Sequence, residues 1–481
     1  MSRLSPFALL IGAAFALLVT LQSINDSDLF WHLETGRLTL AGDLPRVDAF
    51  SWTVRGSPVF TDQWLGDLVL AASRAAAGWP GVLALRALAV FALVTLIVDG
   101  ALAIRPRAPI VAAAAALPAI ALSRFAWTDR PELLGLLCFA VTVRLLRGGD
   151  RELLFAVVLL FVWAQLHGSY ALGLGLILAS CAARAYESRR ERWRFVPIAS
   201  FAVLATLLTP SGLDAWSSSG GHFLAPPRYV SEEGPPDART LPGLLFLGTL
   251  ALVLATAMLA KRATLREAAV LLPVAFVALT AARHTPLLAI AATPYFASCW
   301  PDPLRRWRTG DERDGTTEGP QGEGSLGAKR QRGVPVAAQR RGAASKEGFG
   351  RAGALVIAIG AIALTFAVFG AKVDESGYPR AALGALPSGA GTLNQYDWGG
   401  YLIAFAPSTL VFIDGRLFPY VPDVLADYRE IVGAHPGWES VVARRGVTAM
   451  LVRPTDPIAV RAPERGWRVA FADATSVVLV R

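Results

Sequence analysis

Two carboxylates stand directly after the first long apolar run of the chain. Residues 6–21 are almost wholly apolar, and Asp26 and Asp28 follow, separated by one serine. Acidic side chains are costly at the edge of a bilayer, so this pair predicts chemistry at the membrane surface. The alternative is a structural role, in which Asp28 caps a following helix and both acids stay in water. Trp31 and His32, directly behind the acids, favour the functional interpretation.

Further cationic or titratable side chains interrupt apolar stretches along the chain. They are Arg130, His167, Arg283 and His284. Such side chains bind phosphate groups, and we expect them on the same side of the membrane as the acid pair. The alternative for each is an interfacial anchor whose charged end reaches water. His167 is also a candidate cap for the end of a helix.

The composition indicates a polytopic helical membrane protein. Hydrophobic residues make up 54% of the 481 residues and charged residues only 17%, with a mean hydropathy of +0.45. Soluble proteins average about 25% charged residues. The formal net charge of +9 invites a nucleic-acid partner. The positive side chains lie in loops between apolar runs, however, so we expect a lipid bilayer as the environment and no nucleic acid.

The apolar runs predict about eleven membrane-spanning helices in the cell (inner) membrane. Arg and Lys gather in alternate loops, which places the N-terminus in the cytoplasm and residues 24–80, 210–240 and the C-terminal region outside. No Ala-x-Ala site follows the first run, so we expect an uncleaved helix; a cleavable signal peptide is the alternative. The predicted spans are 5–23, 81–99, 108–123, 132–147, 152–166, 169–185, 195–209, 241–260, 267–282, 284–299 and 352–371.

Composition also predicts the domain organisation. Residues 1–300 form the transmembrane domain. Residues 301–350 are rich in Gly, Arg, Glu, Gln and Ser, so we expect a disordered basic cytoplasmic linker that lies against anionic lipid. A last transmembrane helix occupies 351–372. In 373–481, strand-like runs alternate with helix-like stretches, which predicts a small extracytoplasmic α/β domain. The predicted strands are 409–413, 448–452 and 467–480, the last broken at 473–474, and the predicted helices are 422–432 and 438–445.

The outer loops carry the features expected around a site. In the first outer loop, residues 24–80, apolar residues recur at helical spacing over 29–40, and a second amphipathic helix begins near Asp62. Two helices along the interface would hold the acid pair against the outer leaflet. Loop 210–240 suits either a mobile cover over a substrate or a plain solvated connection. Its notable residues are Trp216, His222, Tyr229, Glu232 and Glu233.

The motifs of the first loop resemble a family of bacterial membrane proteins. They read Asp-x-Asp-Leu-Phe-Trp-His-Leu-x-Thr-Gly from Asp26, Pro-Arg-x-Asp-x-Phe-Ser-Trp-Thr from Pro45, and Asp-Gln-Trp-Leu-Gly-Asp from Asp62. The segments 394–402 and 412–416 are similar to tail motifs of that family. The family in turn is similar to the C-type (GT-C) glycosyltransferases, which have many spans, a long first outer loop and an acidic motif after the first span.

The resemblance implies an integral membrane glycosyltransferase. Such an enzyme moves a sugar from a polyprenyl-phosphate donor to an extracytoplasmic glycan, lipid or protein by carboxylate-assisted direct displacement. Asp26 and Asp28 are the candidate catalytic bases, and the sequence leaves open which one serves. Asp28 is also a candidate ligand of Mg²⁺ or Mn²⁺, although some members of the superfamily use a metal and others do not.

The substrate-binding candidates come from three parts of the chain. Tyr396-Asp397-Trp398-Gly399 is similar to the Trp-Trp-Asp-Tyr-Gly acceptor-reading motif of oligosaccharyltransferases, with a different residue order and downstream context. The candidates are His32, Arg130, His167, Arg283, His284, Tyr396, Asp397 and Trp398.

Two alternatives to an enzyme stay open at this point. A transporter or flippase of lipid-linked sugars should carry ionisable residues in mid-span or two matching halves with broken helices. The acids of this sequence lie at span ends instead, and no matching halves are evident. A non-catalytic assembly protein for envelope glycans would use the C-terminal domain to bind a partner. No nucleophile elbow or metalloprotease motif supports covalent or zinc chemistry.

Overall fold

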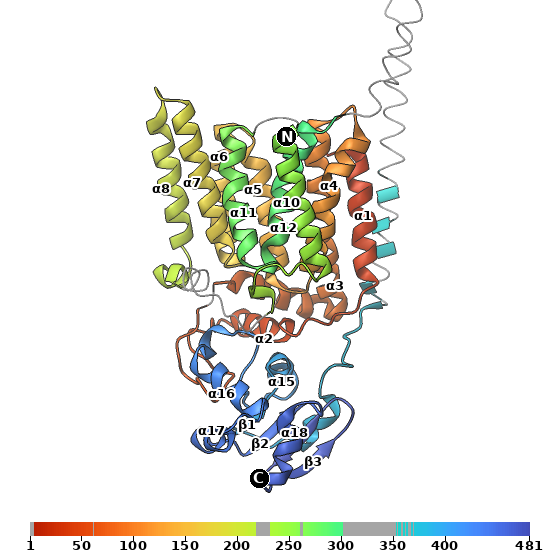
Figure 1. Ribbon diagram of the computed structural model, residues 1–481, viewed down its shortest axis with the longest axis vertical. Coiled ribbons are helices and arrows are strands. Elements are labelled where there is room, and N and C mark those ends of the chain that lie inside the picture. Colours follow the sequence, from red (N-terminus) through yellow and green to blue (C-terminus); the bar gives the residue numbers. More distant parts are fainter. Residues whose placement is uncertain are drawn as a thin grey trace, which may run out of the picture.

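The computed structural model describes residues 4–60, 62–217, 231–259, 263–301 and 371–481, with scattered positions between 353 and 370. A bundle of helices lies at one end of the molecule and a smaller mixed domain at the other (Figure 1). The helices of the first outer loop lie between them. Nearly all of the predicted linker 301–350, much of the predicted span 352–371, and His222 and Tyr229 lie outside the described residues.

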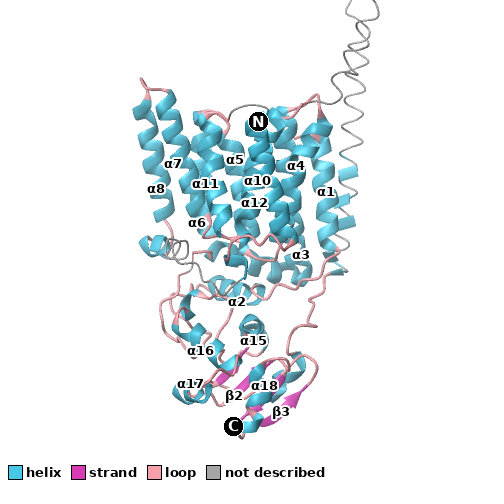
Figure 2. Cartoon of the chain, in the orientation of Figure 1, coloured by secondary structure: helices cyan, strands magenta, loops and turns pink. Residues whose placement is uncertain are grey.

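The bundle consists of helices that run side by side (Figure 2). Helix α12 is central, and nearly every side chain from its start to Ala297 is buried. By length and composition, the segments 64–104, 109–126 and 241–259 qualify as membrane spans among the described residues. The total of about eleven spans stays a prediction. The bundle helices are α1 (Pro6–Thr20), α3 (Trp64–Ile104), α4 (Pro109–Ser123), α5 (Pro131–Leu146), α6 (Asp150–Leu166), α7 (Tyr170–Glu187), α8 (Phe195–Leu207), α10 (Leu241–Leu259), α11 (Leu265–Thr280) and α12 (Thr285–Cys299).

Helix α3 joins two elements that the sequence separated. We expected an amphipathic helix near Asp62 and a distinct span at 81–99, but the structure places both in one element with a break at Gly78. Gly78 has φ 69°, which glycine adopts without the steric cost of a Cβ. Pro80 follows and lacks the N–H that a continuous helix needs. The break therefore lets 64–77 lie across the end of the bundle while the remainder enters it (Figure 1).

The C-terminal domain is built on a small mixed sheet. Its strand order among the described residues is β1 (Thr392–Asn394), β2 (Ala449–Val452), β4 (Val477–Val480) and β3 (Arg468–Ala472). The first pair is parallel and the other two pairs are antiparallel. The predicted strand 409–413 forms only isolated bridges, because its partners are loop residues rather than the sheet. The helices are α15 (Gly399–Phe405), α16 (Asp423–Val432), α17 (Trp438–Arg445) and α18 (Pro457–Arg461).

The C-terminal domain packs directly on the first outer loop. Helix α2 (Leu29–Leu40) lies against α3 and α15. Phe30, fully buried, makes edge-on contacts with Tyr378 and Tyr401 at 5.4 Å between ring centroids. A Cβ on Gly400 would stand 2.6 Å from the carbonyl oxygen of Ser27, so the two segments touch backbone to backbone. The apolar face that we expected to lie on lipid therefore packs on protein.

Candidate active site at the first outer loop

Arg130 joins the two acids that the sequence singled out. Its Nε lies 2.8 Å from Oδ2 of Asp26, and its Nη1 lies 2.9 Å from Oδ2 of Asp28. The backbone N–H of Asp28 also donates to Oδ1 of Asp26 at 3.0 Å. The side chains of Asp28 and Arg130 keep 21% and 22% of their surface exposed. One arginine thus holds both carboxylates while leaving part of the cluster open.

Local structure explains how these residues reach one another. Arg130 is extended and immediately precedes α5, whose first residue is Pro131. Proline at the first helical position presets the helix and needs no hydrogen-bond acceptor. Asp28 precedes α2 but makes no side-chain capping bond. Its carboxylate turns to Arg130 instead, so the capping alternative does not describe the structure.

The environment of Asp28 makes its carboxyl group a weaker acid than an ordinary aspartate. Burial raises the pKa of Asp28 to about 7, Arg130 lowers it in part, and the negative charge of Asp26 raises it again. A carboxyl group with a pKa near neutrality exchanges its proton easily at physiological pH. Asp28 is therefore suited to proton transfer.

A buried pair beneath the cluster fixes the two loops that carry it. Arg86 of α3 bonds Oδ2 of Asp129 at 2.8 Å through Nη1. Its Nη2 donates to the carbonyl oxygens of Val19 at 3.0 Å and Gln22 at 2.8 Å, at the end of α1. Arg86 thereby links the segment before Asp26 to the segment before Arg130. Sequence reasoning missed it, although a lone arginine inside an apolar span was a usable signal.

A cavity of about 640 Å³ opens beside these residues. Most of its wall is polar or charged, and Leu21 and Trp127 are its large apolar residues. Several buried polar atoms of wall residues have no hydrogen-bond partner within the described part of the chain: Arg86 Nε, Trp127 Nε1, Thr128 Oγ1 and Asp129 Oδ1. Buried polar atoms of this kind are commonly satisfied by an ordered buried water. The cavity is lined by Leu21, Gln22, Ser23, Asn25, Asp26, Ser27, Arg86, Trp127, Thr128, Asp129 and Arg130.

Loop 210–240 reaches the same place through its last residues. Oε1 of Glu232 stands 3.7 Å from Nη1 of Arg130. Oε1 of Glu233 lies 2.6 Å from Nη1 of Arg283. His284 neighbours Arg283 in a short 3₁₀ turn, Ala282–His284. Arg283, a candidate for binding phosphate, therefore forms an ion pair with Glu233 of this loop.

The two candidate histidines of this region are held by local bonds. His167 follows α6, where its backbone N–H donates to the carbonyl oxygen of Trp163, and its Nδ1 accepts from the N–H of Ser169 at 3.1 Å. Burial, together with Arg283, lowers the pKa of His167 to about 3. Nδ1 of His32 lies 2.6 Å from Oδ1 of Asp67, and His32 is almost fully buried. Burial likewise lowers the pKa of His32 to about 3. Both rings are therefore neutral, and His32 does not face the cavity.

The candidates of the C-terminal domain point in different directions. The hydroxyl of Tyr396 donates to the carbonyl oxygen of Gly415 at 3.3 Å. Trp398 is buried, and its Nε1 donates to the carbonyl oxygen of Gly377 at 2.8 Å. Asp397 forms an ion pair with Arg453 nearer the surface. Of the three candidates, Tyr396 is therefore the one linked to the acid pair, through the turn at Gly415.

Asp28 is the predicted ligand of a divalent ion. No group of three or more His, Cys, Asp and Glu residues is placed to hold a metal in the described part of the chain. One oxygen of each carboxylate, Oδ2, lies against the guanidinium of Arg130. The Mg²⁺ or Mn²⁺ expected at Asp28 stays a prediction and enters no step below.

Comparison with known proteins gives the fold. No protein-family model and no curated sequence matches the chain. Among solved structures, the chain is similar to the apo form of the oligosaccharyltransferase of Archaeoglobus fulgidus. The TM-score is 0.53 at 10% sequence identity, over 92% of this chain and 69% of that one. At this identity the likeness shows the fold alone. The chain accordingly shares the overall fold of that structure.

Proposed function

We propose that this protein is an integral membrane glycosyltransferase that moves a sugar from a polyprenyl-phosphate donor to an extracytoplasmic acceptor. The observation that carries the proposal is the bridge from Arg130 to Asp26 and Asp28 beside a cavity of about 640 Å³. The likeness to an oligosaccharyltransferase supports the same class. The cavity lining includes the cationic residue Arg130 for a phosphate head group and the apolar residues Leu21 and Trp127 for the start of the lipid.

The proposed reaction is a single displacement. An acceptor hydroxyl forms a bond to the anomeric carbon of the sugar while the bond from that carbon to the donor phosphate oxygen breaks. The proton of the hydroxyl passes to the carboxylate of Asp28 or Asp26, and the bond electrons leave with the polyprenyl phosphate. Arg130 offsets the negative charge on the departing phosphate. The pKa of Asp28, about 7, suits a base that works at neutral pH.

The proposed topology is multi-pass, with a cytoplasmic N-terminus and the active site outside. The N-terminus and the C-terminal domain lie at opposite ends of the bundle, which agrees with an odd number of spans (Figure 1). The N–H of Ser5 and the guanidinium of Arg144 both bind Asp99, so a basic loop lies at the N-terminal end. That arrangement supports the predicted excess of positive charge on the cytoplasmic side.

The test is sugar transfer by the full chain in lipid nanodiscs, with a panel of radiolabelled polyprenyl-phosphate sugars and an extract of envelope acceptors. Asp28→Asn and Asp26→Asn remove a carboxylate but keep the size of the side chain. We expect at least one of them to reduce kcat by about 10²–10⁴-fold, with donor binding retained. Asp43→Asn, an exposed acid of the same loop, is the matched control and should transfer normally.

The same experiment separates the alternatives. A flippase would move the lipid-linked sugar across the bilayer without forming a new glycosidic bond. An assembly protein would bind a glycan or partner equally well with and without Asp26 and Asp28. Absence of transfer from every donor of the panel, or normal transfer by both variants, would remove the proposed function.

A further inference from the structure

A turn of the C-terminal domain presses against Asp28. The turn consists of Asp414, Gly415 and Arg416. A Cβ on Gly415 would overlap Oδ1 of Asp28 and stand 2.8 Å from its Cγ. The carboxylate thus occupies the space that any side chain at position 415 would need. Asp28 is confined between the guanidinium of Arg130 on one side and the backbone of Gly415 on the other.

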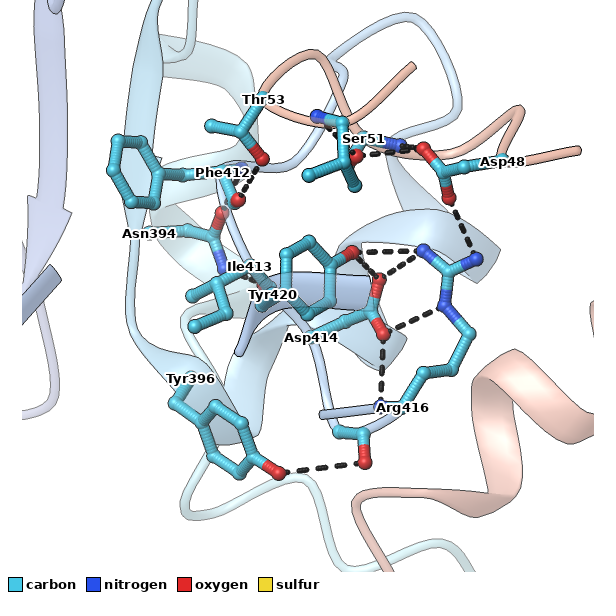
Figure 3. A network of polar contacts seen from close by, with 12 residues as sticks. Asp48, Ser51, Thr53, Asn394, Tyr396, Phe412, Ile413, Asp414, Arg416 and Tyr420 are labelled. Carbon is cyan, nitrogen blue, oxygen red and sulfur yellow. Dashed lines mark hydrogen bonds and ion pairs between the residues drawn. The ribbon is translucent and has the colours of Figure 1, made fainter. Parts of the chain in front are cut away.

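Bonds inside the C-terminal domain fix the shape of this turn (Figure 3). Nε and Nη2 of Arg416 donate to the two oxygens of Asp414 at 2.8 and 2.6 Å. The hydroxyl of Tyr420 donates to Oδ2 of Asp414 at 2.6 Å, and the N–H of Arg416 donates to Oδ1 at 3.0 Å. Asp414 is fully buried, and both of its carboxylate oxygens accept hydrogen bonds. A turn held in this way has little freedom to move away from Asp28.

A further set of bonds ties the turn to the first outer loop (Figure 3). Nη1 of Arg416 lies 2.6 Å from Oδ1 of Asp48. Oδ2 of Asp48 accepts from the N–H of Ser51 at 3.0 Å and from its hydroxyl at 2.6 Å. The hydroxyl of Tyr396 holds the carbonyl oxygen of Gly415 at 3.3 Å. The turn is therefore anchored in both segments that meet at Asp28.

We propose that the Asp414-Gly415-Arg416 turn is a positioning element for Asp28, so that the C-terminal domain completes the active site. The inference rests on the proposed function. Gly415 permits the close approach because it lacks a side chain, and the network around Arg416 keeps the approach constant. Misplacing a catalytic group by about 1 Å costs about 100-fold in rate. The turn therefore contributes to catalysis without touching substrate.

The first test is Gly415→Ala in the full chain, with Gly384→Ala as the matched control, because a Cβ at 384 meets nothing within 4 Å. We expect Gly415→Ala to reduce kcat by about ten- to 100-fold while KM for donor and acceptor stays within about twofold. Gly384→Ala should leave both unchanged. Normal kcat in folded Gly415→Ala overturns the inference.

Tyr396→Phe provides a milder variant in case Gly415→Ala does not fold. It removes the hydrogen bond to the carbonyl oxygen of Gly415 and keeps the ring. We expect kcat to fall a few-fold with KM unchanged, because one of several anchors is lost. If Gly415→Ala does not fold and Tyr396→Phe has normal kcat, the inference is overturned.

A second test reads the contact without sugar transfer. In a chain whose cysteines Cys138, Cys181 and Cys299 are replaced by alanine, Asp28→Cys with Gly415→Cys brings two thiols into overlapping space. We expect mild oxidation to form the disulfide, and Asp28→Cys with Gly384→Cys to form none. Absence of the cross-link contradicts the contact and the inference with it. A cross-link in the double-cysteine chain, together with absence of transfer by the unsubstituted chain, keeps the contact but removes the proposed function.

Discussion

Two clusters in this protein contain the same groups, two aspartates that share one arginine, and differ in burial. Around Arg416, the side chains of Asp48 and Asp414 are 0% exposed and the arginine is 9% exposed. Around Arg130, the side chains of Asp26 and Asp28 are 8% and 21% exposed, and a cavity adjoins them. The first cluster satisfies its charges internally and fixes a fold. The second keeps polar surface for a ligand.

The comparison shows why charge pairing alone does not identify a site. A closed network is costly to form, yet removing one partner costs more, because a charge is left buried without compensation. A partly open cluster tolerates loss of a partner because water replaces it. Adjacent space and a carboxyl group that titrates near neutral pH distinguish the cluster at Arg130.

The largest expected effect tests the closed cluster. Asp414→Asn leaves Arg416 without full compensation, and we expect it to lower the free energy of unfolding by about 3–5 kcal/mol. Denaturant unfolding followed by tryptophan fluorescence measures it. Asp28→Asn should change the free energy of unfolding by less than about 1 kcal/mol. Equal losses in the two variants would remove the distinction between the clusters.

A second prediction concerns the arginine beneath the open cluster. Arg86→Lys keeps the charge but removes the guanidinium, whose several N–H donors reach both Asp129 and the end of α1. We expect a loss of about 1–3 kcal/mol in stability, because buried acceptors are left unsatisfied. A fall in kcat should accompany it. Arg55→Lys, at an exposed position of the first loop, is the control. Normal thermal stability of Arg86→Lys would contradict the role of Arg86 as a frame.

A third prediction follows from the pKa of Asp28. Because burial raises that pKa to about 7, the carboxyl group is protonated below pH 7 and ionised above it. If Asp28 is the base, kcat/KM, which reports the free enzyme, should rise about tenfold per pH unit below pH 7 and level off above it. His32 and His167 each have a pKa of about 3, so neither changes its charge between pH 5 and 8. They therefore add no further change of rate with pH. A flat profile between pH 5 and 8 would exclude Asp28 as the base and leave Asp26.

The smallest expected effect concerns Glu232. Its carboxylate is 3.7 Å from Arg130 and its side chain is 43% exposed, so the pair is weak. We expect Glu232→Gln to change stability by less than about 1 kcal/mol and kcat by only a few-fold. A fall in kcat as large as that expected for Asp28→Asn would mean that Glu232 acts in the reaction together with Asp28.

Sequence reasoning found the open cluster in part. Asp26 and Asp28 were visible because they follow an apolar run, and Arg130 because it interrupts one. The partnership between them was not visible, since Arg130 and Asp28 are 102 residues apart. His32 looked like part of the same motif, but the helix turn that carries it directs the ring to Asp67. Helical spacing predicts on which face of a helix a residue lies. It does not predict which other element packs against that face.

The closed cluster escaped prediction for a similar reason. Asp48 and Arg416 both belong to motifs that resemble family signatures, yet no local pattern pairs them across the length of the chain. The predicted strand 409–413 instead serves as a bridge partner of Ser51, which brings the two motifs together. Such pairings depend on which segments meet when the chain closes.

The amino-acid sequence alone fixes the membrane class, the approximate helices and the α/β character of the C-terminal part, because apolar runs and periodicity act over short stretches. Folding settles the rest: that Arg130 shares two carboxylates, that Arg86 supports their loops, and that Gly415 abuts Asp28. These contacts join distant segments, and their strength depends on burial and on satisfied partners, which exist only once the domains have packed.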